Sequence, residues 1–310
     1  MQNESGLSKQ NLIMVLGASH SGTTMLDLML GNHEETFSAG EVWVHFRPRR
    51  AHHFRIECHC GQDPCPVWEK LKGAGEQEFH KAVLNLDNIN SIVDSSKDLS
   101  WMIDSTQWAK ANNINTRNVV IWKEPIELAY SHWKRGRSLA EFRYDFLTYY
   151  ERFLNLGFPF VSLRFSALVG DPTNTLRKLC EITGLPWQAK QEEFWTKQHH
   201  HLFGAAKTSA QAKTGRSTIK AAQDYPAEFL QLFEKFAKAM THDPRLMRVL
   251  GTLEAMDFEK ANVPGILEQE TRIPAIKPLW YYRHIVTRIF FKRFPQVFIP
   301  AAADVPDQQT

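Results

Sequence analysis

The chain of 310 residues lacks any uncharged apolar run that approaches the ~20 residues needed to cross a membrane. Its start, MQNESGLSKQ, has no apolar stretch of signal-peptide length, so we expect a cytoplasmic protein. An excess of charge is also missing, because 37 Lys and Arg oppose 34 Asp and Glu, for a net charge of +3. This balance excludes bulk attraction to nucleic acid or membranes, and any basic site must be local.

Cysteine is scarce, and three of the four cysteines lie together in CHCGQDPCPVW. Cys58, Cys60 and Cys65, with histidines nearby, suggest zinc, but the CxC start is tighter than a CxxC knuckle and no second pair follows. A zinc ion, a disulfide and free, packed thiols all stay open for this segment. The fourth cysteine, Cys180, lies in a helix-like stretch and is expected to be a small buried apolar residue.

Repeats and low-complexity tracts are absent, and short apolar runs alternate with long amphipathic segments. This alternation predicts an α/β fold with a parallel sheet flanked by crossover helices. Ligand-binding loops should then lie at the carboxyl ends of the strands. The expected strands are LIMVL (12–16), SIVD (91–94), NVVIW (118–122) and FVSLRF (160–165).

Two later segments have clear local signals. A helix is predicted in the first of them, with Asp171 as its N-cap, Pro172 at its first position and Gly184 at its end. Residues 198–224 are polar, contain glycine and show poor periodicity. We expect a long loop there, and long loops in compact domains are usually functional.

The stretch GASHSGTT follows the first apolar run and precedes a helix-like segment. Gly17 and Gly22 stand where a phosphate-binding loop, GxxxxGK[ST], has its glycines, but Thr23 replaces the lysine. Backbone amides and a helix N terminus would bind an anion there. Without the lysine, the loop binds a γ-phosphate and Mg²⁺ poorly. Its hydroxyls and amides are better suited to a single 5′-phosphate that carries one transferable group. A kinase-like enzyme is the alternative, and it predicts binding of Mg²⁺-ATP.

SGTT after a first strand resembles the 5′-phosphosulfate loop of sulfotransferases that use 3′-phosphoadenosine 5′-phosphosulfate (PAPS). In that family an arginine after a later strand, a proline and a serine eight residues beyond the arginine hold the 3′-phosphate. Here Lys123, Pro125 and Ser131 have this spacing in KEPIELAYSHWKRG. The segments GNHEETFSAGEV, VDSSKDL and SLRFSALVGDPTNTLRKLCEITGLPW are similar to bacterial and tyrosine sulfotransferases. Together the resemblance spans about residues 12–220.

The resemblance implies a sulfotransferase fold with a P-loop-like parallel sheet, over residues 10–270 with a cysteine-containing insertion at about 45–75. Residues 271–310 would form a basic, aromatic C-terminal tail. PAPS would be the co-substrate, and no metal would be required. The implied donor-binding residues are Gly17, Ser19, His20, Ser21, Gly22, Thr23, Thr24, Lys123, Ser131, Lys213 and Arg216.

The resemblance also assigns roles in the chemistry. Glu41, in a Gly-Glu unit, would be the base, with His33 and His45 as candidates of lower rank. His20 and Lys97 would stabilise charge on the leaving group. Two positions depart from the family pattern, since His20 replaces a lysine or arginine and Lys123 replaces an arginine. A downstream loop of the family has its nearest match at His201 and Gly204.

The other interpretations are structural: Glu41 pairs with a basic side chain, and Lys97 is an exposed lysine at a helix start. A non-catalytic nucleotide-binding or scaffold protein is the corresponding alternative function. The acceptor would be a small molecule, carbohydrate or lipid with a hydroxyl or amine, and no nucleic-acid partner is expected. Residues 271–303 contain basic and aromatic residues without an acid. This tail either docks on the domain or a second subunit, or contacts a membrane peripherally through residues 271–300.

Overall fold

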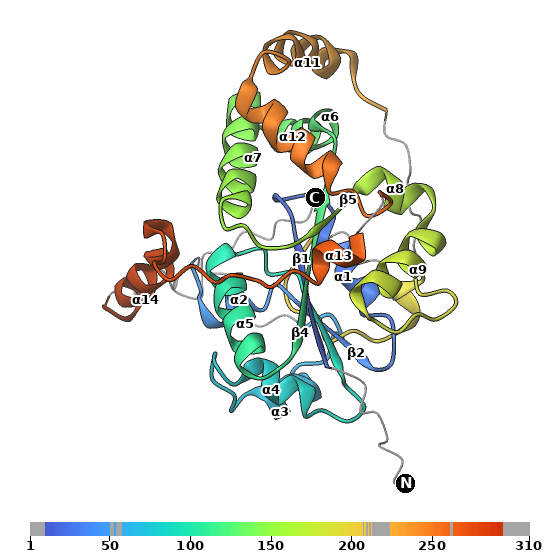
Figure 1. Cartoon of the computed structure of the whole chain (residues 1–310), viewed down its shortest axis with the longest axis vertical. Coiled ribbons are helices and arrows are strands. Elements are labelled where there is room, and N and C mark those ends of the chain that lie inside the picture. Colours follow the sequence, from blue (N-terminus) through green and yellow to red (C-terminus); the bar gives the residue numbers. More distant parts are fainter. Residues whose placement is uncertain are drawn as a thin grey trace.

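The computed structural model describes residues 10–49, 53, 58–206, 208, 210, 212, 224–260 and 263–293. Its centre is a five-stranded sheet in the order β2-β3-β1-β4-β5, and every neighbouring pair is parallel (Figure 1). The predicted α/β class is confirmed. The strands are β1 (Asn11–Leu16), β2 (Thr36–Gly40), β3 (Ser91–Asp94), β4 (Asn115–Trp122) and β5 (Val161–Arg164).

The central strand β1 is buried along its whole length because both of its faces are covered. Leu12 and Met14 pack into the apolar cluster on one side of the sheet. Ile13 and Val15 pack into a second cluster on the other side. A strand between two helical layers needs an uninterrupted apolar run rather than an alternating one, and LIMVL supplies it.

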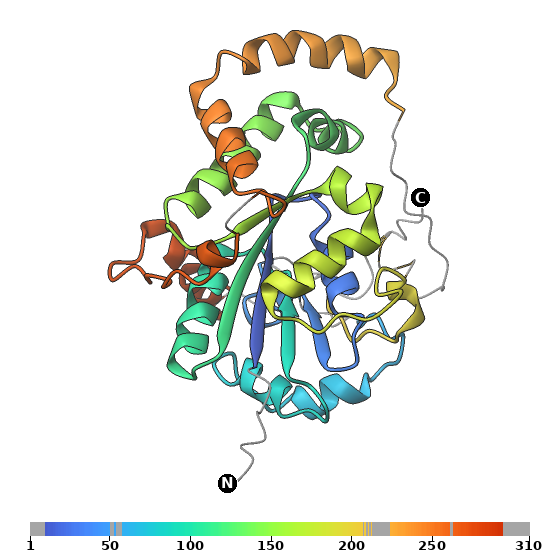
Figure 2. The ribbon, with the colours of Figure 1, turned by 45° about the vertical axis from the view of Figure 1, so that its right-hand side comes forward.

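Helices form a layer on each face of the sheet (Figure 2). Side chains of one group pack into the cluster that holds Ile13: α1 (Thr23–Leu30), α8 (Phe165–Gly170), α9 (Pro172–Thr183) and α13 (Val263–Leu267). Side chains of the other group pack into the cluster that holds Leu12: α3 (Pro66–Leu71), α4 (Phe79–Leu84), α5 (Leu99–Ala111) and α7 (Leu139–Leu154). The short helix α2 (Trp43–Phe46) follows β2 on this second side.

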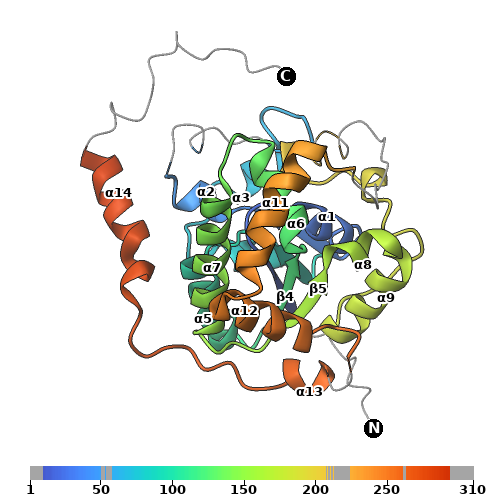
Figure 3. The same ribbon diagram turned by 90° about the horizontal axis from the view of Figure 1, so that it is seen from above.

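Further helices lie beyond the carboxyl ends of the strands. Seen from above, α6, α11 and α12 lie over the sheet, next to the upper part of α7 (Figure 3). They are α6 (Pro125–Trp133), α11 (Ala227–Met240) and α12 (Pro244–Ala255). The loops that follow β1, β3 and β4 therefore lie between the sheet and these helices, at the edge where α/β folds bind ligands.

All four predicted strands and the predicted helix after Asp171 are confirmed. The Asp171 side chain accepts a hydrogen bond from Asn174 N, and Gly184 ends α9 with a φ of 75°. The sequence analysis missed β2 because TFSAG is short and has only one large apolar side chain. The expectation of a loop over 198–224 is wrong at residues 206, 208, 210 and 212, which are helical. Alanine and lysine give this segment a high helix propensity that a search for apolar periodicity does not detect.

The tail docks partly on the domain. In η3 (Leu279–Tyr282) the Tyr281 hydroxyl donates to Asp104 Oδ1 of α5 at 2.5 Å. The following helix α14 (Arg283–Arg293) stands away from the sheet (Figure 3) and exposes Val286 and Ile289. Peripheral membrane contact of the tail stays a prediction. Within the described ranges, no helix combines the length and the apolar character that a membrane crossing requires.

Candidate active site

The predicted phosphate-binding loop, residues 17–22, joins β1 to α1 in a backbone conformation that needs its glycines. Gly17 has a φ of 154° and Gly22 a φ of 107°. A Cβ at Gly17 would lie 2.3 Å from the carbonyl oxygen of Ile121, and one at Gly22 would lie 2.5 Å from the Phe165 ring. Both clashes are too close for any side chain, so the two glycines fix the path of the loop. The positive end of α1 then points toward the bend.

Two tyrosines of α7 hold the start of this loop. Gly17 N donates to the Tyr149 hydroxyl at 3.0 Å, and Ala18 N donates to the Tyr150 hydroxyl at 3.3 Å. Burial raises the pKa of both phenols, which therefore stay protonated and can donate in turn. The sequence analysis missed these tyrosines, because they lie 132 residues from the loop and carry no local motif.

The loop residues predicted to bind the donor divide into two groups. Ser21 supports the loop from below, since its amide donates to Ala18 O at 3.1 Å and its side chain is buried against Gly17. Thr24 is also engaged within the fold, because its hydroxyl accepts from Ala205 N at 3.0 Å. Ser19 is exposed at the bend. The loop side chains best placed for a ligand are therefore Ser19 and His20, which are both exposed, whereas Thr23 is buried and its hydroxyl accepts from Lys97 Nζ.

Lys97 and Glu41 meet at this loop. Lys97 Nζ lies 2.5 Å from Glu41 Oε1 and 3.2 Å from Thr23 Oγ1. Glu41 follows β2, Lys97 follows β3, and Thr23 starts the helix after β1. The three side chains therefore lie at the carboxyl ends of three adjacent strands. The alternative of an exposed helix-start lysine is wrong, because the Lys97 side chain is only 17% exposed.

The backbone around Lys97 is built to turn the side chain inward. Lys97 has a φ of 59°. Ser96 N donates to Asp94 Oδ1 at 2.8 Å, and the Asp98 carboxylate caps α5 by accepting from Ser100 N and Trp101 N. Asp94 and Ser96 therefore shape this turn. The lower-ranked bases make other contacts: His33 Nδ1 accepts from Glu35 N, and the His45 ring packs on Phe46.

The pKa of His20, in the same loop, differs from that of a free histidine. The residue is exposed, but Arg135, Lys97 and Lys123 bring positive charge to its imidazole, and the His132 ring centroid lies 6.0 Å away. Loss of water around the ring, followed by the positive charge of Arg135, lowers the pKa of His20 to about 4. At neutral pH the imidazole is therefore uncharged, and a neutral imidazole has one N–H group to donate.

The second predicted anion site lies at the end of β4. Lys123 follows the strand, and its ammonium lies 4.1 Å above the Phe165 ring. Ser131 is buried on α6, which begins at Pro125 with a capping box formed by Glu124 and Glu127. Burial is the main cause that lowers the pKa of Lys123, followed by nearby charges that include Arg135.

Arg135 connects the two anion sites, and the sequence analysis did not single it out. Its guanidinium donates to the Ser131 carbonyl at 2.5 Å, and its charge acts on both His20 and Lys123. The signal was the short spacing, because Arg135 follows Ser131 by four residues and lies in the turn directly after α6, from which it reaches back to the last turn of the helix. Two other predicted donor-binding residues, Lys213 and Arg216, lie outside the described residues.

A buried polar network supports Glu41 from beneath. The Ser38 hydroxyl lies 2.5 Å from Asp27 Oδ1 and 2.7 Å from His201 Nδ1. Gly40 N donates to Asp27 Oδ2 at 3.2 Å, and Glu41 N donates to Leu202 O at 2.9 Å. Burial raises the pKa of Asp27 to about 7, and burial lowers the pKa of His201. The network fixes the turn that presents Glu41 to Lys97.

A cavity of about 290 Å³ opens beside the phosphate-binding loop. Ser19 and Lys97 line it on the loop side, and Trp280 and Arg283 of the tail line it opposite. Arg49 also lines the cavity and pairs with Asp98 at 2.8 Å. The docked tail thus helps to form the space in front of Lys97.

Comparison with known proteins gives similarity in structure alone. No family model matches the sequence, and no curated protein matches it. The chain is similar to three solved sulfotransferase structures, at TM-scores between 0.40 and 0.47. The first is the sulfotransferase domain from the curacin biosynthetic pathway, at 15% identity over 74% of this chain and 98% of that one, with a TM-score of 0.46.

The other two structures are similar at the same level. The sulfotransferase domain of the Synechococcus olefin synthase shares 14% identity over 76% of this chain and 98% of its own, with a TM-score of 0.47. The sulfotransferase from Alicyclobacillus acidocaldarius shares 12% identity over 82% of this chain and 98% of its own, with a TM-score of 0.40. A specific activity has to be argued from the residues of the site.

Proposed function

We propose that this protein is a PAPS-dependent sulfotransferase that moves a sulfuryl group to a hydroxyl or amine acceptor. The observation that carries the proposal is the position of Lys97. Its ammonium lies between Thr23 Oγ1 and Glu41 Oε1, at 3.2 and 2.5 Å, beside a phosphate-binding loop without a lysine of its own. A cation, a hydroxyl and a carboxylate at one anion site supply the three functions that sulfuryl transfer requires.

The donor would occupy both anion sites. Loop amides and the N terminus of α1 would hold the 5′-phosphosulfate, and Lys123, Ser131 and Arg135 would hold the 3′-phosphate. The two sites follow different strands, β1 and β4, so they favour a nucleotide with anionic groups on two carbons of its ribose. A linear triphosphate would leave the second site unused.

The proposed reaction is an in-line displacement at sulfur. The acceptor oxygen or nitrogen bonds to sulfur while the bond from sulfur to the bridging oxygen of the 5′-phosphate breaks. The electron pair stays on that oxygen, which leaves with 3′,5′-adenosine diphosphate, and the acceptor proton passes to Glu41. Such a loose transition state gains most from positioning and from neutralising charge on the leaving oxygen.

Three side chains would divide this work. Lys97 would move from Glu41 to the sulfuryl oxygens when the donor binds, which frees the carboxylate to accept a proton. His20, neutral at pH 7 because its pKa is about 4, would donate a hydrogen bond to the bridging oxygen. Thr23 would complete the set of donors with its hydroxyl.

The acceptor would enter through the cavity lined by Ser19, Lys97 and Trp280. Its volume of about 290 Å³ suits a small molecule or the end of a carbohydrate or lipid. Basic side chains on its wall, Arg152 and Arg283 among them, favour an acceptor that carries a negative charge or several hydroxyls.

A thermal-shift titration tests the donor site without knowledge of the acceptor. The ligands are 3′,5′-adenosine diphosphate, AMP and Mg²⁺-ATP. At 100 times its dissociation constant a ligand adds about 2.7 kcal/mol to the stability, which raises the melting temperature by several degrees. We expect this shift with the diphosphate, a smaller one with AMP and none with Mg²⁺-ATP.

The other outcomes assign the chain to another class. A shift with Mg²⁺-ATP alone would show a kinase-like enzyme and overturn the proposal. No shift with any nucleotide would favour a scaffold protein. If the diphosphate binds, slow transfer of the sulfuryl group from PAPS to water, followed by mass spectrometry, measures the chemistry before an acceptor is found.

A further inference from the structure

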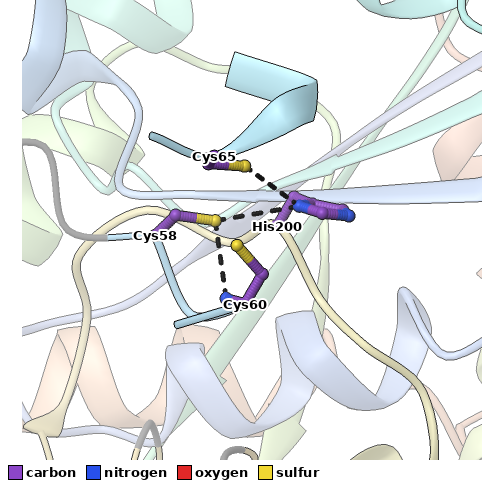
Figure 4. A group of neighbouring side chains, drawn as sticks. All are labelled: Cys58, Cys60, Cys65 and His200. Carbon is purple, nitrogen blue, oxygen red and sulfur yellow. Dashed lines mark hydrogen bonds between the residues drawn. The ribbon is translucent and has the colours of Figure 1, made fainter. Parts of the chain in front are cut away.

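Four side chains that bind soft metals meet at one point away from the donor site. They are Cys58, Cys60, Cys65 and His200, and one ligand atom from each lies within 4.8 Å of all the others (Figure 4). The three cysteines come from the segment between α2 and α3, whereas His200 comes from the segment after the short helix η2 (Phe194–Thr196). The sequence analysis left zinc, a disulfide and free thiols open, and it did not single out His200.

The distances suit a tetrahedral ion. His200 Nδ1 lies 3.2 Å from Cys65 Sγ and 3.9 Å from Cys58 Sγ. Around a zinc ion with bonds of 2.3 Å to sulfur and 2.0–2.1 Å to nitrogen, neighbouring ligand atoms stand roughly 3.5–3.8 Å apart. These two distances differ from the tetrahedral values by a few tenths of an ångström, and the other pairs of ligand atoms, all within 4.8 Å of each other, would have to close by at most about 1 Å.

Neighbouring groups hold the ligands in place. Cys60 N points at Cys58 Sγ at 3.5 Å, and Gln62 N points at Cys60 Sγ at 3.5 Å. Amide donors of this kind stabilise the negative charge of thiolates that bind a metal. The Trp68 indole donates to the backbone oxygen of His200 at 2.7 Å, which fixes the one ligand that is distant in sequence.

The four ligands define the kind of site. Three thiolates and one imidazole form a soft set that favours zinc over calcium or magnesium. Four protein ligands fill a tetrahedral coordination sphere and leave no position for water or substrate, as in structural zinc sites. A disulfide would use only two of the three thiols and would leave His200 without a role.

The backbone next to the cluster leads to the candidate active site. His59 N donates to His201 O at 3.0 Å, and Cys58 forms an isolated β-bridge with Leu202. Leu202 O then accepts from Glu41 N, and Ala205 N donates to Thr24 Oγ1. An ion bound by the three cysteines and by His200 would fix the segment 200–205 against the turns that carry Glu41 and Thr24.

We propose that Cys58, Cys60, Cys65 and His200 bind one structural zinc ion. The ion joins the cysteine-containing insertion to the segment that supports Glu41. It takes no part in sulfuryl transfer, and the proposal does not depend on the assigned activity, since metal content and spectra report on the ion alone.

The test begins with the full chain, purified without a histidine tag, and with elemental analysis of its zinc. We expect one zinc per chain in the wild type and in Cys180→Ser, because Cys180 is a buried cysteine of α9 outside the cluster. Cys65→Ser and His200→Ala should lose most of the bound zinc. A strong chelator should then lower the melting temperature of the wild type and of Cys180→Ser, and leave that of Cys65→Ser unchanged.

Cobalt gives a spectroscopic test of the same ligands. Addition of Co²⁺ to the metal-free wild type should produce the visible bands of tetrahedral cobalt and a sulfur-to-cobalt charge-transfer band, saturating at one equivalent. Cys60→Ser, with two thiolates left, should lose about a third of the charge-transfer intensity. Wild type that binds neither metal, or whose mass shows the loss of two hydrogens for a disulfide within the cluster, would overturn the proposal.

Discussion

Lys97 Nζ lies 2.5 Å from Glu41 Oε1, and this contact brings together the ends of two strands, β3 and β2, at the phosphate-binding loop. Both side chains are about four-fifths buried, with 17% and 21% exposure. Because the ion pair is partly shielded from water, dissolved salt screens it less than an ion pair on the open surface. In the proposed reaction, Lys97 would leave Glu41 to bind the anionic donor, and the carboxylate would then be free to accept a proton.

The first prediction concerns Lys97. In Lys97→Met we expect the turnover of PAPS to fall roughly 10²–10³-fold, the range for the loss of one group that stabilises developing charge. Lys110→Met is the matched control, because Lys110 also pairs with a glutamate, Glu270, but stands on the exposed side of α5. Equal turnover in the two variants would remove Lys97 from the chemistry.

The second prediction concerns Glu41→Gln, which distinguishes a role of Glu41 as the base from a role only as the ion-pair partner of Lys97. The amide keeps the shape of the side chain but cannot take the acceptor proton. Turnover should fall about 10²–10⁴-fold, whereas the affinity for 3′,5′-adenosine diphosphate should stay within about threefold. A loss of nucleotide affinity with unchanged turnover at saturation would assign Glu41 a structural role instead.

The third prediction concerns His20, which stands where the sulfotransferase loops that this loop resembles in sequence have a lysine or arginine. Since its pKa is about 4, it is neutral at pH 7, while Arg135, Lys97 and Lys123 already bring positive charge to the loop. A fourth cation would repel these groups, so His20→Lys should lower the melting temperature and raise turnover less than about threefold. His20→Asn, which keeps an N–H donor, should retain more activity than His20→Ala. A large gain in His20→Lys would show that the wild-type site is impaired.

Arg135 supports the fourth prediction, which concerns the second phosphate. Charge-assisted hydrogen bonds contribute about 1.5–3 kcal/mol, so Arg135→Ala should weaken binding of 3′,5′-adenosine diphosphate about 10–100-fold. Affinity for AMP, which has no 3′-phosphate, should change little. Arg177→Ala, on the exposed surface of α9, is the control. Calorimetry with both nucleotides measures the difference, and equal losses for the two would place Arg135 away from the 3′-phosphate.

Much of the fold was readable from the sequence because apolar runs and helix signals are local. LIMVL is long, β-branched in part and bounded by glycine, so it predicts a central strand correctly. TFSAG did not predict a strand, because β2 lies at the edge of the sheet, where a short segment with one aromatic residue is enough to form a strand. The parallel order then placed Thr23, Lys97 and Lys123 at one edge, as predicted, without any knowledge of side-chain contacts.

The parts of the site that the sequence did not reveal depend on partners far apart along the chain. Tyr149 reaches Gly17 across 132 residues, and His200 reaches Cys65 across 135. Neither residue stands in a motif, since a tyrosine on an amphipathic helix and a histidine among other histidines are common. Only the packing of α7 on the sheet, and the return of the chain past Glu41, bring these residues to the loop and to the cysteines.

The last prediction is a dependence of stability on pH, caused by Asp27. Burial is the largest cause that raises its pKa from 3.8 to about 7, so the folded state binds more protons than the unfolded state between these values. Stability from this group is therefore fully present below pH 4 and is lost as the pH rises through 7. About three pKa units correspond to at most ~4 kcal/mol, spread over this range.

Asp27→Asn tests the origin of this effect. The amide can accept from Gly40 N and donate to the Ser38 hydroxyl, which in turn donates to His201 Nδ1, so it reproduces the protonated carboxyl. Between pH 5 and 8 the melting temperature of the variant should fall less than that of the wild type, and at pH 8 the variant should be at least as stable. Asp171→Asn, at an exposed N-cap, is the control that should keep the wild-type slope over this range, because the pKa of Asp171 lies below its usual value. If the melting temperatures of Asp27→Asn and the wild type change with pH by the same amount, the buried carboxyl stays ionised through its hydrogen bonds to Ser38 and Gly40.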